Sequence, residues 1–141
     1  MVMAHPYYHA VSSARKFGGQ PEDYLPIHNW FDASKAFAAD FRHRVLRHHA
    51  EGIFECERQF GTTIMNSAGQ KIPVRQIGEQ HVKEDFNGKI PSLQDWIETI
   101  QPARWMMKSQ KLSCTPVGES QANADPNSSR LQDFEQANPQ P

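Results

Sequence analysis

The sequence predicts a mainly α protein, a compact bundle of about five short helices with one small β-hairpin at about residues 62–74. Two observations predict this fold. Residues on one stripe of the 41–60 segment recur at steps of mainly three and four, which is the period of an amphipathic helix. The one stretch that changes period surrounds Asn66-Ser67-Ala68-Gly69, a turn sequence with glycine where positive φ is needed.

Helix boundaries follow from proline, glycine and capping residues. Pro6 suits the first turn of a helix and Gly18-Gly19 suits its end, so a first helix is expected over about 6–16. Two prolines then bracket a turn, after which residues 27–38 are expected to form a second helix.

The longest predicted helix covers about residues 41–60, with Asp40 as its N-cap and Gly61 at its end. One stripe of this helix is formed by Phe41, Val45, His48, His49, Gly52, Ile53, Cys56 and Phe60. Glycine in a helix interior costs about 0.5–1 kcal/mol relative to alanine. Gly52 therefore indicates that another backbone, a ring or a ligand comes close to this stripe.

Two further helices are expected after the hairpin. One covers about residues 75–86 and stops at Asn87-Gly88. The last covers 93–100, and Ser92 with Asp95 has the spacing of a capping box at its start.

The chain is expected to hold one helical domain, 1–112, followed by a disordered tail, 113–141. The tail has one arginine and four acidic residues among Gln, Asn, Ser and Pro, and its only bulky apolar residues are Val117, Leu131 and Phe134. Three such side chains cannot offset a backbone ordering cost of about 1–2 kcal/mol per residue.

Composition excludes several classes of protein. The chain has 141 residues with 15 Lys+Arg against 16 Asp+Glu, so it has no overall positive charge for wrapping nucleic acid, and sequence-specific nucleic-acid binding is not expected. Two cysteines exclude a disulfide-dense scaffold. No run of 18 apolar residues and no signal peptide are found, so a cytoplasmic protein without membrane contact is expected.

Several motifs are shared with a known family. They include His5-Pro6-Tyr7-Tyr8-His9-Ala10, Ile27-His28-Asn29-Trp30-Phe31-Asp32, Arg42-His43-Arg44-Val45-Leu46-Arg47-His48-His49 and Glu79-Gln80-His81-Val82-Lys83-Glu84-Asp85. On these segments the chain resembles an uncharacterised family (a domain of unknown function) of small proteins from bacteria and bacteriophages, over about residues 4–100. The resemblance implies a bacterial cell or a phage-infected host as the setting. It implies no activity and no functional residue.

Seven histidines are the main chemical signal, and all lie between residues 5 and 81. Imidazole is the commonest metal ligand, and carboxylates complete harder sites. Placed on the predicted helices, the inward-facing candidates for metal ligands are His9, His28, His48 and His81. We therefore expect a divalent transition metal (Zn, Fe, Mn or Ni) held inside the bundle. The alternatives are a pocket that works without metal and histidines with a purely structural role.

Two carboxylates are candidates for catalysis beside that metal. Asp32 lies four residues after His28, and Glu84 three residues after His81, so each shares a helix face with a histidine. Either could complete the ligand set or act as a general base. This arrangement resembles helical metallohydrolases of the HD type, which would imply hydrolysis of a phosphoester. His48-His49 is followed by Ala50 and not by aspartate, so no tight metal motif is present.

The alternative hypothesis is a non-catalytic bacterial or phage accessory protein. It would bind a nucleotide-like ligand or a host protein through a basic run and nearby aromatic side chains, namely Arg42, Arg44, Arg47, Trp30 and Tyr8. The simpler interpretations are a solvated helix face for the arginines and core packing for the aromatics. The oligomeric state is not predicted.

Overall fold

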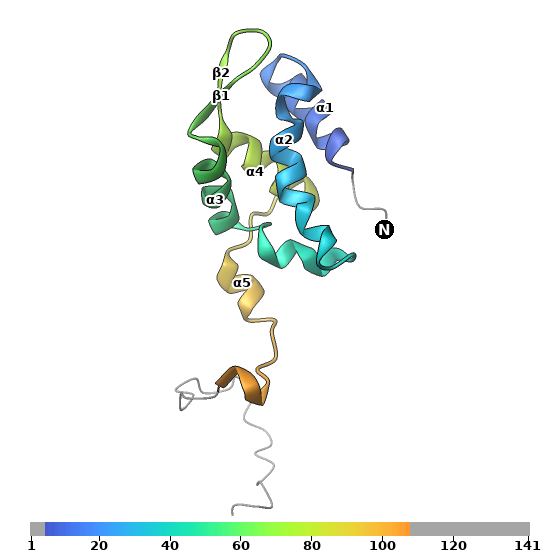
Figure 1. The fold of residues 1–141 in the computed structure, drawn as a ribbon, viewed down its shortest axis with the longest axis vertical. Helices are drawn as coiled ribbons and strands as arrows, with labels where there is room; N and C mark the ends of the chain where they lie inside the picture. Colours follow the sequence, from blue (N-terminus) through green and yellow to red (C-terminus); the bar gives the residue numbers. More distant parts are fainter. Residues whose placement is uncertain (1–4, 108–141) are drawn as a thin grey trace, which may run out of the picture. The chain divides into compact units, whose positions relative to one another are not determined.

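The structure, a computed structural model, describes residues 5–107. These residues fall into two units, one that ends at Gln101 and one that begins at Pro102. The first unit contains five α-helices, two 3-10 helices and one two-stranded sheet, so the predicted mainly helical fold with a small hairpin is confirmed (Figure 1). In the second unit the described residues include the short 3-10 helix η3 (Arg104–Met107). The predicted tail, 113–141, lies outside the described residues.

The first helix, α1 (Pro6–Phe17), begins and ends where the sequence indicates. Pro6 occupies its first turn, and the ring of His5 caps it by accepting the N–H of Tyr7 at 3.2 Å. Gly18 ends it with φ of 84°, a backbone angle that glycine adopts without strain.

The second helix, α2 (Pro21–Asp32), starts six residues earlier than predicted. Its start is fixed by Asp23, whose carboxylate accepts the backbone N–H of Gln20 at 2.8 Å, while Pro21 fills the first turn. Pro26 does not break the helix but lies within it, with its ring exposed. The expected helix over 27–38 is therefore wrong at both ends, because capping at Gln20 outweighs the missing N–H of Pro26.

The predicted long helix over 41–60 is two elements. Residues after α2 form the 3-10 helices η1 (Ala33–Ala36) and η2 (Phe41–Leu46), and α3 (Ala50–Phe60) begins only after His49. The His49 ring accepts the N–H of Gly52 at 2.9 Å and so acts as the N-cap of α3. The chain also folds back on itself here, since a Cβ on Gly52 would lie 1.8 Å from the carbonyl oxygen of Arg47. The close approach expected at Gly52 is that of a backbone.

The hairpin pairs β1 (Thr63–Met65) with β2 (Lys71–Pro73) in antiparallel register, with Ile64 opposite Ile72. Helix α4 (Val74–Asp85) follows directly, and α5 (Leu93–Ile97) begins with the predicted capping box of Ser92. The side chain of Asp23 ties the hairpin turn to α2 by accepting the N–H and the hydroxyl of Ser67.

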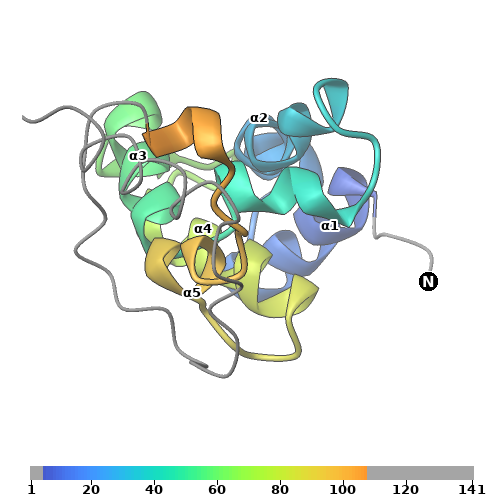
Figure 2. The ribbon, with the colours of Figure 1, turned by 90° about the horizontal axis from the view of Figure 1, so that it is seen from below.

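Helix α4 lies at the centre of the first unit. It contacts α1 and α2 on one side and α3 on the other, as Figures 1 and 2 show. The apolar core gathers around it and consists of Ala10, Tyr24, Ile27, Phe31, Ile53, Cys56, Ile72, Val74, Ile77 and Val82. Any polar side chain on the inner face of α4 is therefore removed from water and needs a partner.

Candidate metal centre

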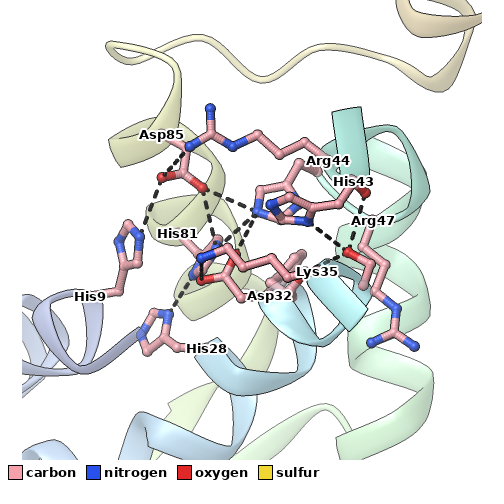
Figure 3. Close-up of polar contacts among 12 residues, drawn as sticks. His9, His28, Asp32, Lys35, His43, Arg44, Arg47, His81 and Asp85 are labelled. Carbon is pink, nitrogen blue, oxygen red and sulfur yellow. Dashed lines mark hydrogen bonds and ion pairs between the residues drawn. The ribbon is translucent and has the colours of Figure 1, made fainter. Parts of the chain in front are cut away.

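Six histidines are buried: His9, His28, His43, His48, His49 and His81. Buried imidazoles are costly unless each ring nitrogen finds a partner. His43 and His49 have local partners, because Nδ1 of His43 contacts the hydroxyl of Ser34 at 2.8 Å and His49 caps α3, although Nε2 of His43 has no hydrogen-bond partner. The other four rings lie in one cluster around α4 (Figure 3).

Two of these histidines and two carboxylates bring four possible metal-ligand atoms together. Each offers one ligand atom, and the four atoms all lie within 4.8 Å of one another; the residues are Asp32, His48, His81 and Asp85. Asp32 ends α2, His48 lies in the segment between η2 and α3, and the other two belong to the last turns of α4. Three segments far apart in sequence thus build one site.

The five separations that involve an imidazole nitrogen are short. Nε2 of His48 lies 3.1 Å from Nε2 of His81, 3.3 Å from Oδ1 of Asp32 and 3.1 Å from Oδ2 of Asp85. Nε2 of His81 lies 3.5 Å from each of the same two carboxylate oxygens. Both histidine side chains have no exposed surface.

Local structure explains why these side chains converge. His81 and Asp85 are four residues apart on α4, so they lie on the same face one turn apart. The ring of Phe31, from the last turn of α2, stacks on His81 with centroids 4.8 Å apart and so holds that ring in place. His48 is held through its backbone, because the indole N–H of Trp96 donates to its carbonyl at 3.1 Å.

Both carboxylates of the group are ionised. Burial opposes their charge, but the contact of Asp32 with His48 and that of Asp85 with the same ring hold both pKa values well below the usual range. Cations lie on their outer oxygens: Lys35 is 3.7 Å from Oδ2 of Asp32, and Arg44 is 3.5 Å from Oδ1 of Asp85. The inner oxygens remain directed at the two imidazoles.

His9 lies beside the group and not within it. Its Nε2 is 3.4 Å from the outer oxygen of Asp85, and its Nδ1 is 3.1 Å from Glu84. Burial opposes charge on this ring, but Asp85 and Glu84 together outweigh it and raise the pKa of His9 to about 9. A protonated ring has no lone pair for a metal, so His9 serves here as a cation beside Asp85.

His28 lies outside the group and contacts it through the ring of His81. Its Nδ1 is 2.9 Å from Nδ1 of His81, and its Nε2 is 2.8 Å from the hydroxyl of Ser13. Burial lowers the pKa of His28 to about 2 and that of His81 to about 4. Both rings are therefore neutral near pH 7, as a ligand and its partner need to be.

The structure brings together three of the residues that the sequence singles out, Asp32, His48 and His81. Sequence reasoning missed Asp85 and took its neighbour Glu84 instead, which contacts His9 and lies outside the group. The spacing along α4 could have identified Asp85. A step of four from His81 leads to Asp85, whereas the step of three to Glu84 leads to a carboxylate that is one-third exposed.

Of the five predicted ligand-binding residues, the structure brings Arg47 and Trp30 into contact and gives Arg42 and Arg44 other partners. Arg42 is exposed and pairs with Asp40, Arg44 reaches Asp85, and the guanidinium of Arg47 lies 4.1 Å from the centre of the Trp30 ring. Tyr8, on α1, is 68% exposed and lies apart from these contacts. The three arginines thus serve three different partners.

His43 is buried next to the group. It belongs to the basic run at residues 42–49, but its side chain is buried against Ser34 where the chain turns in 3-10 form. Its ring contacts that of His48 edge to face, with centroids 5.3 Å apart. It is therefore a neighbour of the group without belonging to it.

Across residues 5–107, no helix is long and apolar enough to cross a membrane. Searches of curated proteins and of solved structures give no significant match to this chain. The model of one protein family, described as "Domain of unknown function (DUF6915)", matches residues 4–106, which is most of the chain. The expected membership in a domain family of unknown function is confirmed: this protein belongs to the DUF6915 family.

Proposed function

We propose that this protein binds one divalent transition-metal ion, zinc foremost, through Asp32, His48, His81 and Asp85. The observation that carries the proposal is the convergence of two imidazole nitrogens and two carboxylate oxygens within 4.8 Å, at a buried point of the fold. These are the ligand types that zinc, iron, manganese and nickel take from proteins. Asp85 replaces the other two predicted ligands, His9 and His28, which act on the group from outside.

Five of the six separations support a small tetrahedral ion. A zinc ion with ligands at about 2.0–2.1 Å places them about 3.3–3.4 Å from one another, whereas neighbouring ligands of an octahedron of the same radius lie about 2.8–3.0 Å apart. The five separations that involve the imidazole nitrogens run from 3.1 to 3.5 Å. These five separations fit zinc, and the two carboxylate oxygens, at most 4.8 Å apart, would need to lie about 3.3–3.4 Å from each other in the bound state.

Charge also favours a cation at this point. Two ionised carboxylate oxygens at most 4.8 Å apart repel each other by about 3 kcal/mol or more at an effective dielectric constant near 20. A divalent ion between Asp32 and Asp85 replaces this repulsion with attraction and leaves their outer oxygens to Lys35 and Arg44.

Metal analysis of untagged protein tests the proposal. Protein loaded with zinc and passed over a desalting column should retain one ion per chain, and cobalt in its place should give the intense visible bands of a tetrahedral site. Asp85→Asn should release the ion, while Glu79→Gln, a matched loss of charge on the same helix, should retain it. Zinc at one hundred times its dissociation constant should stabilise the wild type by about 2.7 kcal/mol. Protein that retains no metal and melts at the same temperature with zinc or chelator would refute the proposal.

We further propose that the metal-bound protein hydrolyses a phosphoester. The ion, when bound, supplies Lewis-acid chemistry by lowering the pKa of water to about 7. Four protein ligands close a zinc site, and catalytic sites keep three, so one carboxylate would have to turn away and open the buried site to substrate. Asp32 is suited to do so because Lys35 lies beside its outer oxygen, and the same lysine would attract a phosphate group. Zinc-loaded protein should hydrolyse bis(p-nitrophenyl) phosphate, and Lys35→Met should slow it; equal rates with and without zinc would refute the hydrolytic role alone.

A further inference from the structure

A chain of hydrogen bonds links the surface of α4 to the metal-facing ring of His81. The amide nitrogen of Gln80 contacts the carboxylate of Glu84 and lies 3.3 Å from the carbonyl of His9. Its amide oxygen lies 2.8 Å from the hydroxyl of Ser13. The chain continues from Ser13 to Nε2 of His28 at 2.8 Å and from Nδ1 of His28 to Nδ1 of His81 at 2.9 Å. Ser13, His28 and His81 are all fully buried.

The direction of each bond follows from the amide of Gln80. Its nitrogen faces a carboxylate and a carbonyl, both of which only accept, so the amide cannot be turned over. Its oxygen therefore faces Ser13 and must accept the single hydroxyl proton of that residue. Once Ser13 has given its proton, its oxygen accepts from His28.

The two rings are then fixed in turn. His28 donates from Nε2, so in its neutral form its Nδ1 carries the lone pair and accepts from Nδ1 of His81. His81 therefore carries its proton on Nδ1, and its Nε2 presents a lone pair to the group. That nitrogen cannot donate to the carboxylate oxygens 3.5 Å away, and it is oriented as a metal ligand before any ion arrives.

We propose that Gln80, Ser13 and His28 are positioning residues that hold His81 in its metal-binding tautomer. The inference rests on the proposed metal binding and adds three residues that do not touch the ion. Without this chain, the proton of His81 is free to move to Nε2, where it points into the site and must be displaced before an ion can bind. Loss of such outer contacts typically lowers metal affinity about 10–100-fold.

The serine contacts provide a matched pair of variants. Ser13 and Ser34 are both buried, and each has its hydroxyl 2.8 Å from a buried histidine ring, but only the chain through Ser13 leads to a ligand. Ser13→Ala should lower the affinity for zinc, measured by competition with a coloured chelator, while Ser34→Ala should leave it unchanged. His28→Leu should lower it about 10–100-fold, and His28→Asn, whose amide oxygen can replace Nδ1 as acceptor, should restore most of it.

The tautomer itself is measured without any variant. Nitrogen-15 NMR of labelled histidine in the metal-free wild type should show the proton of His81 on Nδ1 and that of His28 on Nε2. A proton on Nε2 of His81 would overturn the inference, and so would equal zinc affinity of the folded Ser13→Ala and Ser34→Ala proteins while the wild type binds zinc. A wild type that binds no zinc would instead refute the proposed function, and the positioning role would fall with it.

Discussion

Replacing Gly52 by alanine probes how tightly the chain folds back before α3. A Cβ at this position would lie 1.8 Å from the carbonyl oxygen of Arg47 and 2.6 Å from its carbonyl carbon, both of them backbone atoms. The backbone would have to retreat by more than about 1 Å to reach ordinary contact. Overpacking of this kind costs about 1–3 kcal/mol, and a backbone obstacle belongs at the upper end. Alanine recovers at most about 1 kcal/mol in helix propensity.

The expected net loss is about 2 kcal/mol or more, which lowers the melting temperature by about 8–16 °C in a domain of this size. Gly78→Ala is the control, since it adds the same methyl group to a helical glycine whose nearest neighbours are side-chain atoms of Phe31 and Ile53 at 3.2–3.4 Å. That variant should change stability by less than about 1 kcal/mol. Circular dichroism melts of both variants measure the difference. Equal melting temperatures would show that the chain does not pass behind Gly52 as described. Because Arg47 adjoins His48, Gly52→Ala should also weaken metal binding.

Three further outcomes are expected. His48→Ala should lose bound zinc completely, whereas His43→Ala should retain zinc and melt at a lower temperature. Metal analysis after desalting measures the zinc content of both variants. Equal loss of zinc from both would contradict the proposed ligands. The pKa of His9 lies at about 9 in the fold against its ordinary 6.5, so protonation of this ring stabilises the metal-free protein fully below pH 6.5 and ceases to do so as the pH rises through 9. Between pH 6.5 and pH 10, the free energy of unfolding in urea should therefore fall by up to about 3 kcal/mol more for the wild type than for His9→Gln. Parallel pH dependences of the two proteins would contradict this. Burial raises the pKa of Cys56 to about 12, so in a Cys114→Ser protein the remaining thiol should react with Ellman's reagent at pH 8 only after urea is added.

Patterns that depend on neighbouring residues could be predicted from the sequence. The hairpin around Asn66 to Gly69 and the capping box of Ser92 are local, because turn and cap residues act within four positions of the chain. The convergence of Asp32, His48 and His81 was also expected from inward-facing positions. In each case the residue type and its spacing carry the information.

Other features depend on contacts that a pattern does not contain. An apolar stripe over 41–60 fits one helix, but the chain turns after Arg47, and His49 serves as a cap where a stripe position was expected. The choice between Glu84 and Asp85 depends on the rotation of α4 against α2, which no local period fixes. Imidazole is ligand, cap, cation or core residue according to its neighbours, so counting histidines cannot separate these roles.

The complete burial of the His48 and His81 side chains would also govern how fast a bound ion leaves. An ion held there would be enclosed by α2, α4 and the segment before α3 and would leave only when one of these parts opens, so its dissociation rate would depend on local unfolding as well as on the strength of the coordination bonds. The rate of isotope exchange of bound zinc would then measure the rate of that opening. Removing the hydrogen bond from the Trp96 indole to the carbonyl of His48 should therefore speed up zinc exchange without changing any proposed ligand.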